Sequence, residues 1–244
     1  NKAHVRQLLR ELTAAGFRSS TKPSLVISLG GDGTYLFAER KFPGVPKILI
    51  RDNSICYQCN DHTLHEIITS LTRNQFIIKK NMMLAATVTT RSGKKHEEEE
   101  KQMTCVNDFI LRNKDPTQAL RFTTLVNGKA FEGTIIGDGV VVATPFGSTG
   151  YFYSITRKKF SKGIGVAFNN TALPLPAKIL SDHSSISITI LRNAAQLSAD
   201  NNPSIITLHP GDTVTIAKSS RTAQRVILTS GLKGMIDKLF NNKR

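Results

Sequence analysis

A glycine-rich segment with a single carboxylate lies between an apolar run and a helix-like pattern near the start of the chain. It reads GGDGT, residues 30–34, and follows the apolar stretch 25–29. Glycines let backbone N–H groups approach a ligand without an obstructing Cβ, and a helix N-terminus favours phosphate. Asp32 would repel a phosphate, so its carboxylate is better suited to binding a metal or accepting a proton from an attacking hydroxyl. The alternative is a tight strand-to-helix turn with an aspartate cap.

Two further segments carry polar groups where apolar residues are expected. Asn107 and Asp108 interrupt the β-patterned run VNDFILRN, which a bulge at a strand edge would also explain. Asp138 lies between glycines at the start of an apolar strand within residues 137–154, GDGVVVATPFGSTGYFYS. That strand leads into small hydroxyl residues and Tyr151, which can hydrogen-bond a base and pack on its face. The alternative for this segment is a Gly/Pro-rich connection into a helix.

Cysteine and histidine recur at intervals of three in one short segment, at Cys56, Cys59, His62 and His65. Such residues can bind zinc, but four ligands within ten residues are tight for a tetrahedral site, and His65 falls inside an expected helix. We therefore favour a loop and a helix start that happen to contain these residues.

The composition indicates a globular protein of one large or two small domains, since the chain has 244 residues. An odd number of cysteines, 3, argues against a secreted disulfide framework. The net charge of +15 permits polyanionic partners but is scattered along the chain. No apolar run approaches the roughly 18–20 residues of a membrane span. We expect a cytoplasmic protein without a membrane or nucleic-acid partner; residue 1 is Asn, so a true N-terminus and a first strand could be missing.

The elements that must position these residues change character along the chain. Up to about residue 78, apolar runs alternate with helical patterns, which predicts a parallel α/β layer. Its expected strands are residues 24–29 and 45–51, and its expected helices are 2–17, 34–42 and 61–73, the last capped by Asp61.

After residue 78 the apolar period changes to two, which predicts hairpins. The acidic run 97–100 is expected at a polar hairpin tip, and Asn127-Gly128 is a strong hairpin signal. Residues 211–219 and 221–230 are expected to form another strand pair. The predicted domains are therefore an α/β domain over 1–78, with a C-terminal helix over 232–244 packing back on it, and a β-rich domain over 79–231.

Taken in this order, the three polar segments resemble those of the NAD kinases, which use ATP or polyphosphate. The pattern of that family is a Gly-Gly-Asp-Gly loop, an Asn-Glu/Asp pair, an Asp-Gly strand leading into Thr-Pro-x-Gly-Ser-Thr-x-Tyr, and a late aspartate, here Asp200 in QLSADN. The loop alone is weakly specific, whereas TPFGSTGY discriminates well. The resemblance spans residues 24–230 and implies a Rossmann-like α/β domain, a β-sandwich-like domain, and an active site between them.

The resemblance implies phosphorylation of the adenosine-ribose 2′-hydroxyl of NAD, giving NADP. Asp32 would be the catalytic base or polarising group, and Mg²⁺ would accompany the phosphoryl donor without a fixed protein site. Asn107 and Asp108 would bind a ribose, Asp138 the nicotinamide end, and Tyr151 the adenine. The implied NAD-binding residues are Asp32, Gly33, Tyr57, Asn107, Asp108, Asp138, Thr149, Gly150, Tyr151, Ser154 and Asp200, and the implied phosphate-binding residues are Gly30, Gly31, Gly33 and Thr34.

Three departures from the family pattern leave substrate preference and subunit contacts open. The second strand usually leads into Asn/His-x-Gly-x-Leu-Gly-Phe, but RDNSICYQ lacks both glycines, and Tyr57 is the aromatic that remains. SITRKK replaces Ser-x-Gly-Gly, and Asn201 replaces a glycine. We still expect a homo-oligomer, a dimer or tetramer. The alternatives are a related lipid or sugar kinase, which TPFGSTGY argues against, and a non-catalytic nucleotide-binding protein of the same fold.

Overall fold

The computed structural model of the chain describes residues 2–52, 56–60, 62–91 and 98–229. These residues form two compact units, one running to Asn81 and resuming at Ala223, the other comprising Met82–Thr222. The expected boundaries were 78 and 231. Residues 223–229 lie in the first unit because the end of strand β15 (Thr213–Leu228) pairs with strand β2 (Lys47–Arg51). The expected C-terminal helix lies outside the described residues.

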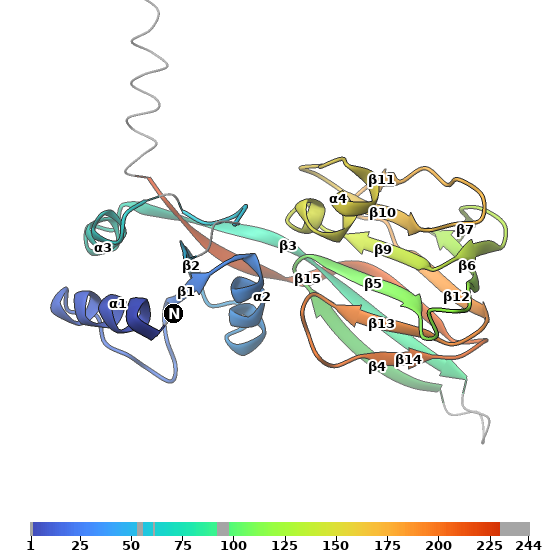
Figure 1. The fold of residues 1–244 in the computed structure, drawn as a ribbon, viewed down its shortest axis with the longest axis horizontal. Coiled ribbons are helices and arrows are strands. Elements are labelled where there is room, and N and C mark those ends of the chain that lie inside the picture. The colour runs from blue at the N-terminus through green and yellow to red at the C-terminus, as the bar shows by residue number, and fades with distance from the viewer. Residues whose placement is uncertain (1, 53–55, 61, 92–97, 230–244) are drawn as a thin grey trace, which may run out of the picture. The chain divides into compact units, whose positions relative to one another are not determined.

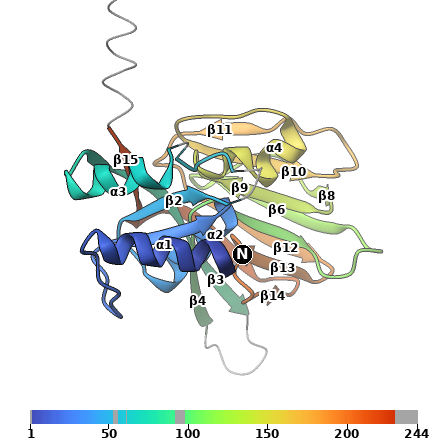
Figure 2. The ribbon, with the colours of Figure 1, turned by 60° about the vertical axis from the view of Figure 1, so that its left-hand side comes forward.

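The first unit is the expected α/β layer. Strands β1 (Val26–Gly30) and β2 are parallel and paired in register from Val26↔Lys47 to Gly30↔Arg51. Figures 1 and 2 show them with the helices α1 (Lys2–Ala14), α2 (Asp32–Lys41) and α3 (Leu64–Thr72). An apolar core draws residues from these helices, from β2 and from the end of β15, namely Leu8, Leu12, Ile48, Ile50, Ile67, Leu71, Val226 and Leu228.

Two helix starts differ from the expectation. Helix α2 begins at Asp32, two residues earlier than predicted, so the aspartate lies in its first turn. Helix α3 is capped by Thr63 rather than by Asp61, which is outside the described residues. The Thr63 hydroxyl accepts a hydrogen bond from Glu66 N, and the Glu66 carboxylate accepts one from Thr63 N at 2.7 Å. This reciprocal capping box satisfies two backbone donors, one of them the N–H of the N-cap residue itself.

A buried ion pair fixes the connection between α2 and β2. The Lys47 ammonium contacts the Glu39 carboxylate and donates to the carbonyls of Phe42 and Val45, each at 2.7 Å. The other Glu39 oxygen accepts from Gly44 N at 2.8 Å. Burial lowers the pKa of Lys47, and the hydrogen bond and the charge of Glu39 oppose that effect. Nothing in the sequence pattern indicated this pair, because its members look like ordinary surface residues of a helix and a strand end.

The second unit is a β-sandwich, as expected. One sheet has the strand order β11-β10-β9-β5-β13-β14; in the other, β12 pairs with β6 and with the start of β15 (Figure 1). The first sheet comprises β5 (Asp108–Asn113), β9 (Gly139–Ala143), β10 (Ile164–Asn169), β11 (Lys178–Leu180), β13 (Ala195–Ala199) and β14 (Ile206–Leu208). The second comprises β3 (Phe76–Arg91), β4 (Glu98–Cys105), β6 (Leu120–Val126), β7 (Lys129–Ala130), β8 (Ile135–Gly137), β12 (Ile186–Arg192) and β15.

The core of the sandwich follows from the period of two. Alternate residues of both sheets are buried against one another, as in the burial patterns of β12 in one sheet and β13 in the other. One cluster joins Leu84 of β3, Phe109 of β5, Phe122 of β6 and Ile188 of β12. The only helical elements described in this unit are the short η1 (Gly147–Thr149) and α4 (Tyr151–Thr156).

Two expected hairpins are present, since β6 pairs with β7 and β3 with β4, and one expected strand pair is absent. Asn127 and Gly128, with φ of 52° and 76°, turn β6 into β7 as predicted. By contrast, residues 213–228 form one continuous strand instead of two, because no Gly or Pro interrupts them. The described part of the acidic run, 98–100, belongs to β4 rather than to a hairpin tip, because pairing with β3 extends to Arg91↔Glu98.

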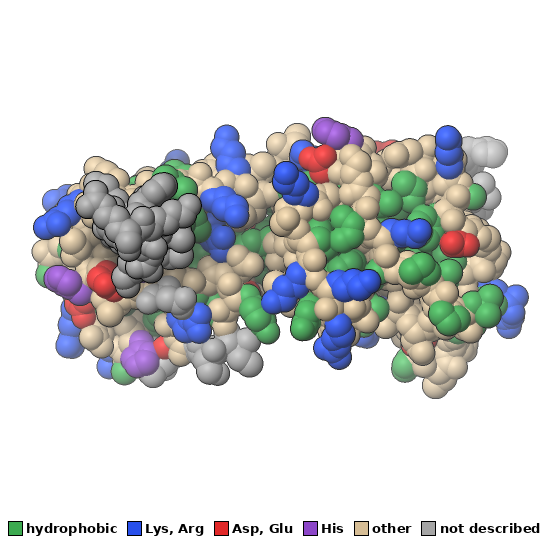
Figure 3. Space-filling view, turned by 90° about the horizontal axis from the view of Figure 1, so that it is seen from above, with side chains coloured by type: hydrophobic (Ala, Val, Ile, Leu, Met, Phe, Trp, Pro, Cys, Tyr) green, Lys and Arg blue, Asp and Glu red, His purple; other side chains and the backbone are tan. Residues whose placement is uncertain are grey.

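Basic side chains are spread over the face of the molecule that Figure 3 presents. Figure 3 shows Lys and Arg scattered among apolar and other side chains over the face that it presents. Among the described residues, no helix combines the length and the apolar character needed to cross a membrane.

Candidate functional site

The GGDGT segment forms the turn from β1 into α2. Gly30 has a φ of +148°, and a Cβ there would lie 2.3 Å from the Thr34 hydroxyl oxygen, so the turn requires glycine. Gly31 occupies the N-cap position without a side-chain cap. Gly33 and Thr34 are exposed, and α2 therefore presents the backbone of its first turn to solvent.

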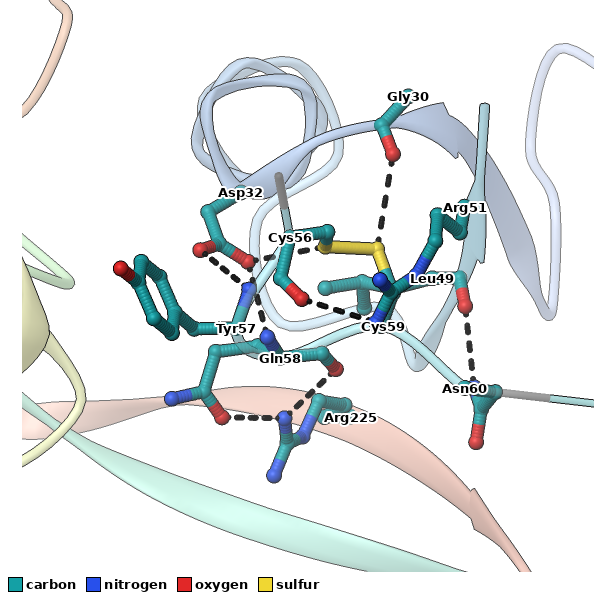
Figure 4. The surroundings of a disulfide bond; sticks show 10 residues. All are labelled: Gly30, Asp32, Leu49, Arg51, Cys56, Tyr57, Gln58, Cys59, Asn60 and Arg225. Atoms are coloured by element: carbon teal, nitrogen blue, oxygen red, sulfur yellow. Dashed lines mark hydrogen bonds between the residues drawn. A yellow bond between two sulfur atoms is a disulfide. The ribbon is translucent and has the colours of Figure 1, made fainter. Parts of the chain in front are cut away.

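The Asp32 carboxylate is oriented by a different segment, residues 56–60. Its two oxygens accept hydrogen bonds from Tyr57 N and Gln58 N, each at 3.1 Å (Figure 4). Asp32 is therefore not the cap of its own helix, which rules out the simple capped-turn alternative. Two backbone donors fix the direction of the carboxylate and leave each oxygen with further acceptor capacity.

The two nearby cysteines are joined rather than arranged around a metal. Cys56 and Cys59 form a disulfide, and their sulfur atoms and the Asp32 carboxylate lie within 4.8 Å of one another. Within the part of the chain that the structure describes, this is the only such group of potential metal ligands, and His62 and His65 are not members of it. The four-ligand zinc interpretation is thus not realised. Tyr57, between the cysteines, is 60% exposed.

In the second unit, Asn107 and Asp108 lie where the chain enters β5, against the turn that follows β9. The buried Thr144 hydroxyl donates to the Val106 carbonyl and accepts from Gly147 N at 3.1 Å. A Cβ on Gly147 would lie 2.2 Å from the Asn107 carbonyl oxygen. The glycine of TPFGSTGY therefore lets the two backbones meet, which brings two separate motifs of the sequence together.

Asp108 and Asp200 share this region but have different environments. The Asp200 carboxylate accepts from the backbone N–H groups of Val106, Asn107 and Asp108 at 2.8, 2.7 and 3.3 Å. Asp108 is only 4% exposed. Burial, and then the charge of Asp200, raise the pKa of Asp108 to about 7, although a hydrogen bond from the backbone of Tyr151 acts in the opposite direction. Asp200 thus shapes the Asn107–Asp108 backbone, and Asp108 is a carboxyl group that ionises near neutrality.

The Asn107 side chain has an unpaired polar atom. Its Oδ1 is buried and has no hydrogen-bond partner among the described residues. A buried polar atom without a partner is costly, so native proteins usually retain one for a ligand or an ordered water. Its Nδ2 faces Gly150, where an added Cβ would lie 3.7 Å away. The Asn107 amide is therefore poised to bind a polar group absent from the structure.

Asp138 and Tyr151 are both held by asparagine amides. The Asp138 carboxylate accepts from Asn170 at 2.8 Å and from Asn113 at 3.4 Å, and the Tyr151 hydroxyl accepts from Asn169 at 3.3 Å. Sequence reasoning missed these three asparagines. A signal was present, because the apolar run of β10 leads into two consecutive asparagines, Asn169 and Asn170, and the run of β5 ends in Asn113.

The remaining predicted residues lie on η1 and α4. Thr149 is half-buried and Gly150 is exposed at the junction of the two helices. The Ser154 hydroxyl donates to the Tyr151 carbonyl at 2.8 Å, one turn back in its own helix. In this arrangement Ser154 stabilises α4 instead of presenting a free donor.

Comparison with known proteins assigns the chain to a family. The sequence model described as the ATP-NAD kinase C-terminal domain matches residues 106–228, slightly more than half of the chain. The chain belongs to this family. The match includes Asn107, Asp108, Asp138, the TPFGSTGY segment and Asp200, which are the polar groups assembled in the second unit.

Individual relatives agree with this assignment. The chain is 33% identical over 160 residues to an NAD kinase of Citrifermentans bemidjiense, covering 62% of this chain and 53% of that protein. It spans between about a quarter and a half of the length of the curated relatives it matches.

Two solved structures share the fold. A yeast NADH kinase complexed with NADH has a TM-score of 0.75 and 21% identity, over 91% of this chain and 67% of that one. An NAD kinase from Archaeoglobus fulgidus in complex with ATP has a TM-score of 0.72 and 17% identity, over 96% of this chain and 94% of that one.

Proposed function

We propose that the protein is an NAD kinase that transfers a phosphoryl group from ATP to the adenosine-ribose 2′-hydroxyl of NAD, giving NADP. The observation that carries the proposal is the Asp32 carboxylate, held by two backbone donors at the start of α2. Phosphoryl transfer requires mainly positioning, charge neutralisation and one group that manages the hydroxyl proton. A carboxylate with a fixed direction and spare acceptor capacity provides that last requirement.

The glycine-rich turn around Asp32 supports binding of the donor's phosphates. Gly31 is the N-cap of α2, and Gly33 and Thr34 lie in its first turn, at the end of the helix where the dipole favours anions. Asp32 itself is the exception, and in our proposal it faces the attacking hydroxyl rather than a phosphate.

The second unit supports binding of the dinucleotide. The unpartnered Oδ1 of Asn107 can accept from a ribose hydroxyl, and the neighbouring Asp108 can accept or donate near neutral pH. Tyr151 offers an aromatic face for adenine, and Asp138 a carboxylate for the nicotinamide amide. We assign Asp200 to shaping this site through the backbone of residues 106–108 rather than to contacting the ribose.

The proposal also includes the metal ion, the phosphoryl donor, the cellular compartment and the oligomeric state. Mg²⁺ would enter bound to the phosphoryl donor. The ligand group around Asp32 offers one carboxylate and two disulfide sulfurs, which is a poor set for an ion that prefers oxygen. ATP is the donor favoured here and polyphosphate the alternative. We further propose a cytoplasmic homo-oligomer.

The direct test is an assay of NADP formation from NAD with MgATP and, separately, with polyphosphate. We expect NADP with at least one donor. Asp32→Asn should retain NAD binding and lose about 100-fold or more of the turnover, as removal of a general base does. Asp182→Asn is a matched control, because Asp182 is an exposed aspartate that pairs only with surface groups in the described structure. Absence of NADP from both donors would refute the proposal and favour a lipid or sugar substrate or a non-catalytic role.

A further inference from the structure

The segment 56–60 carries a Cys-x-x-Cys pair that the proposed phosphoryl transfer does not use. Cys56 and Cys59 are bonded to each other at the end of the segment that orients Asp32 (Figure 4). The third cysteine, Cys105, is a fully buried thiol of the second unit whose pKa burial raises well above its ordinary value. A buried thiol with a raised pKa reacts slowly, so we assign thiol–disulfide chemistry in this chain to Cys56 and Cys59.

The segment is anchored independently of its disulfide. The Arg51 guanidinium donates to the Cys56 carbonyl at 3.1 Å, and the Asn60 amide donates to the Leu49 carbonyl at 3.1 Å. Arg225 donates to the Gln58 backbone carbonyl at 2.9 Å and to its side-chain oxygen at 2.6 Å. Because these bonds reach β2 and β15, reduction of the disulfide would leave the segment in place beside Asp32.

The sulfur of Cys56 lies in direct contact with the group proposed to accept the hydroxyl proton. Its Sγ is 3.2 Å from Asp32 Oδ1, the same oxygen that accepts from Gln58 N. A disulfide sulfur carries no hydrogen, so in the bonded state Cys56 donates nothing to this oxygen. A thiol at the same position would carry an S–H at hydrogen-bonding distance. The oxidation state of the pair therefore sets how many donors the carboxylate receives.

The two cysteines differ in exposure. Cys56 is buried at 7% exposure, whereas Cys59 is partly exposed. An external thiolate therefore attacks Cys59 Sγ, the S–S bond breaks, and its electron pair goes to Cys56 Sγ, which takes a proton. The second thiol of the reductant then displaces Cys59 from the mixed disulfide. Overall, a dithiol gives two electrons and two protons to the pair and becomes a disulfide itself.

We propose that Cys56 and Cys59 form a thiol–disulfide exchange site that switches Asp32. In the oxidised state no S–H donates to Oδ1, which accepts only from Gln58 N among the contacts of this segment. In the reduced state the Cys56 thiol donates a hydrogen bond to Oδ1 and makes this oxygen a weaker acceptor for the substrate hydroxyl. The partner is a dithiol or disulfide, either a small molecule or a protein. The effect on turnover rests on the proposed kinase function, whereas the contact between thiol and carboxylate does not.

The first test measures that contact without any turnover. In Cys59→Ala with Cys105→Ser, Cys56 is the one remaining thiol, and its alkylation rate at fixed pH reports its thiolate fraction. Adding Asp32→Asn should speed alkylation at least about fivefold, because a neighbouring carboxylate disfavours the thiolate. Adding Asp182→Asn, at a distant exposed aspartate, should leave the rate unchanged. Equal rates with Asp32 and with Asn at position 32 would overturn the proposal.

The second test measures the switch. The protein is equilibrated with reduced or oxidised dithiothreitol, alkylated for mass analysis, and assayed for NADP formation. We expect Cys56 and Cys59 to be modified together, and turnover to fall about fivefold to tenfold on reduction, the range expected for one competing hydrogen bond. The KM for ATP should not change. Cys105→Ser should respond as the parent protein does.

Two single variants separate the donor from the cross-link. Cys59→Ala keeps a permanent thiol at position 56, and Cys56→Ala removes it, yet neither can form the disulfide. We expect neither to respond to the redox buffer and Cys56→Ala to turn over faster. Equal turnover of the two would overturn the proposal, since only the lost cross-link would then matter. If no state forms NADP, the kinase proposal fails, and the alkylation test alone decides the thiol–carboxylate contact.

Discussion

Replacing Asp108 by asparagine should stabilise the protein at pH 8 and weaken NAD binding at the same time. Asp108 is almost fully buried, and burial together with the charge of Asp200 raises its pKa from 3.8 to about 7. Asparagine has nearly the same shape and keeps an oxygen for the backbone N–H of Tyr151. It removes a charge that the folded protein accommodates poorly.

The sign and size follow from proton linkage. Because the folded state binds the Asp108 proton more tightly than the unfolded state, this group's contribution to stability is fully present below about pH 4. It is lost as the pH rises from about 4 through about 7. At about 1.4 kcal/mol for each tenfold change in proton affinity, the loss is on the order of 4 kcal/mol. Rearrangement and water entry at the ionised carboxylate would reduce that figure, so it is an upper bound.

Urea unfolding at a series of pH values between 4.5 and 8 provides the measurement. The free energy of unfolding of Asp108→Asn relative to the parent protein should grow more favourable across this range and level off above pH 7. NAD affinity, measured at pH 8, should fall because the ribose loses an ionised acceptor. A difference in stability that does not change with pH, or a less stable variant at pH 8, would refute the reasoning.

Asp200→Asn is the matched control, and its effect on the unfolding free energy should have the opposite sign. Asp200 accepts three backbone hydrogen bonds, so Asp200→Asn removes a charged acceptor that the fold uses. Unfolding free energy should fall by about 1.5–3 kcal/mol at pH 8, the typical value of hydrogen bonds to a charged group. Two aspartates whose backbones are hydrogen-bonded to each other would then respond to the same substitution in opposite directions.

Two other predictions concern backbone approach and buried charge. Gly147→Ala should destabilise the protein by about 1–3 kcal/mol and abolish NADP formation, because its Cβ would lie 2.2 Å from the Asn107 carbonyl oxygen. Gly133→Ala is the control: a Cβ there would meet nothing within 4 Å, so this variant should be neutral in the same urea and activity assays. Lys47→Met should lower the unfolding free energy by about 3–5 kcal/mol because it leaves the Glu39 carboxylate buried without its cation, and adding Glu39→Gln should restore part of the loss. A Lys47→Met protein as stable as the parent would contradict the second prediction.

The parts of the fold that the sequence predicted are those governed by local chemistry. Asn127-Gly128 forms its hairpin because both residues adopt positive φ, and β1 ends in glycines because the turn into α2 allows no Cβ at Gly30. The two wrong expectations about strands depended on strand pairing, which the local residue pattern does not show. The acidic residues 98–100 entered β4 because β3 continued opposite them, and 213–228 stayed one strand because its two ends found partners in β12 and β2.

The candidate site shows the same division. Four residues of the candidate site could be identified because each is a polar residue that interrupts an apolar pattern: Asp32, Asn107, Asp108 and Asp138. The role of Asp200 could not, since a carboxylate that binds backbone N–H groups more than 90 residues away leaves no local signature. The supporting asparagines were equally hidden, because an amide at a strand end is unremarkable until its partner is known.

One departure from the family pattern coincides with the contact between Cys56 and Asp32. The family's second strand usually leads into a segment with two glycines, which would turn by backbone freedom alone. Here that stretch contains Cys56 and is followed by Cys59, and side chains hold the described segment 56–60: a disulfide, Arg51 and Asn60. The outcome for Asp32 is two well-placed backbone donors. The difference is that a turn built on a disulfide can be altered by a thiol, whereas a turn built on glycine cannot. A substitution that looks like loss of a motif in the sequence is therefore, in the structure, a new means of acting on the same carboxylate.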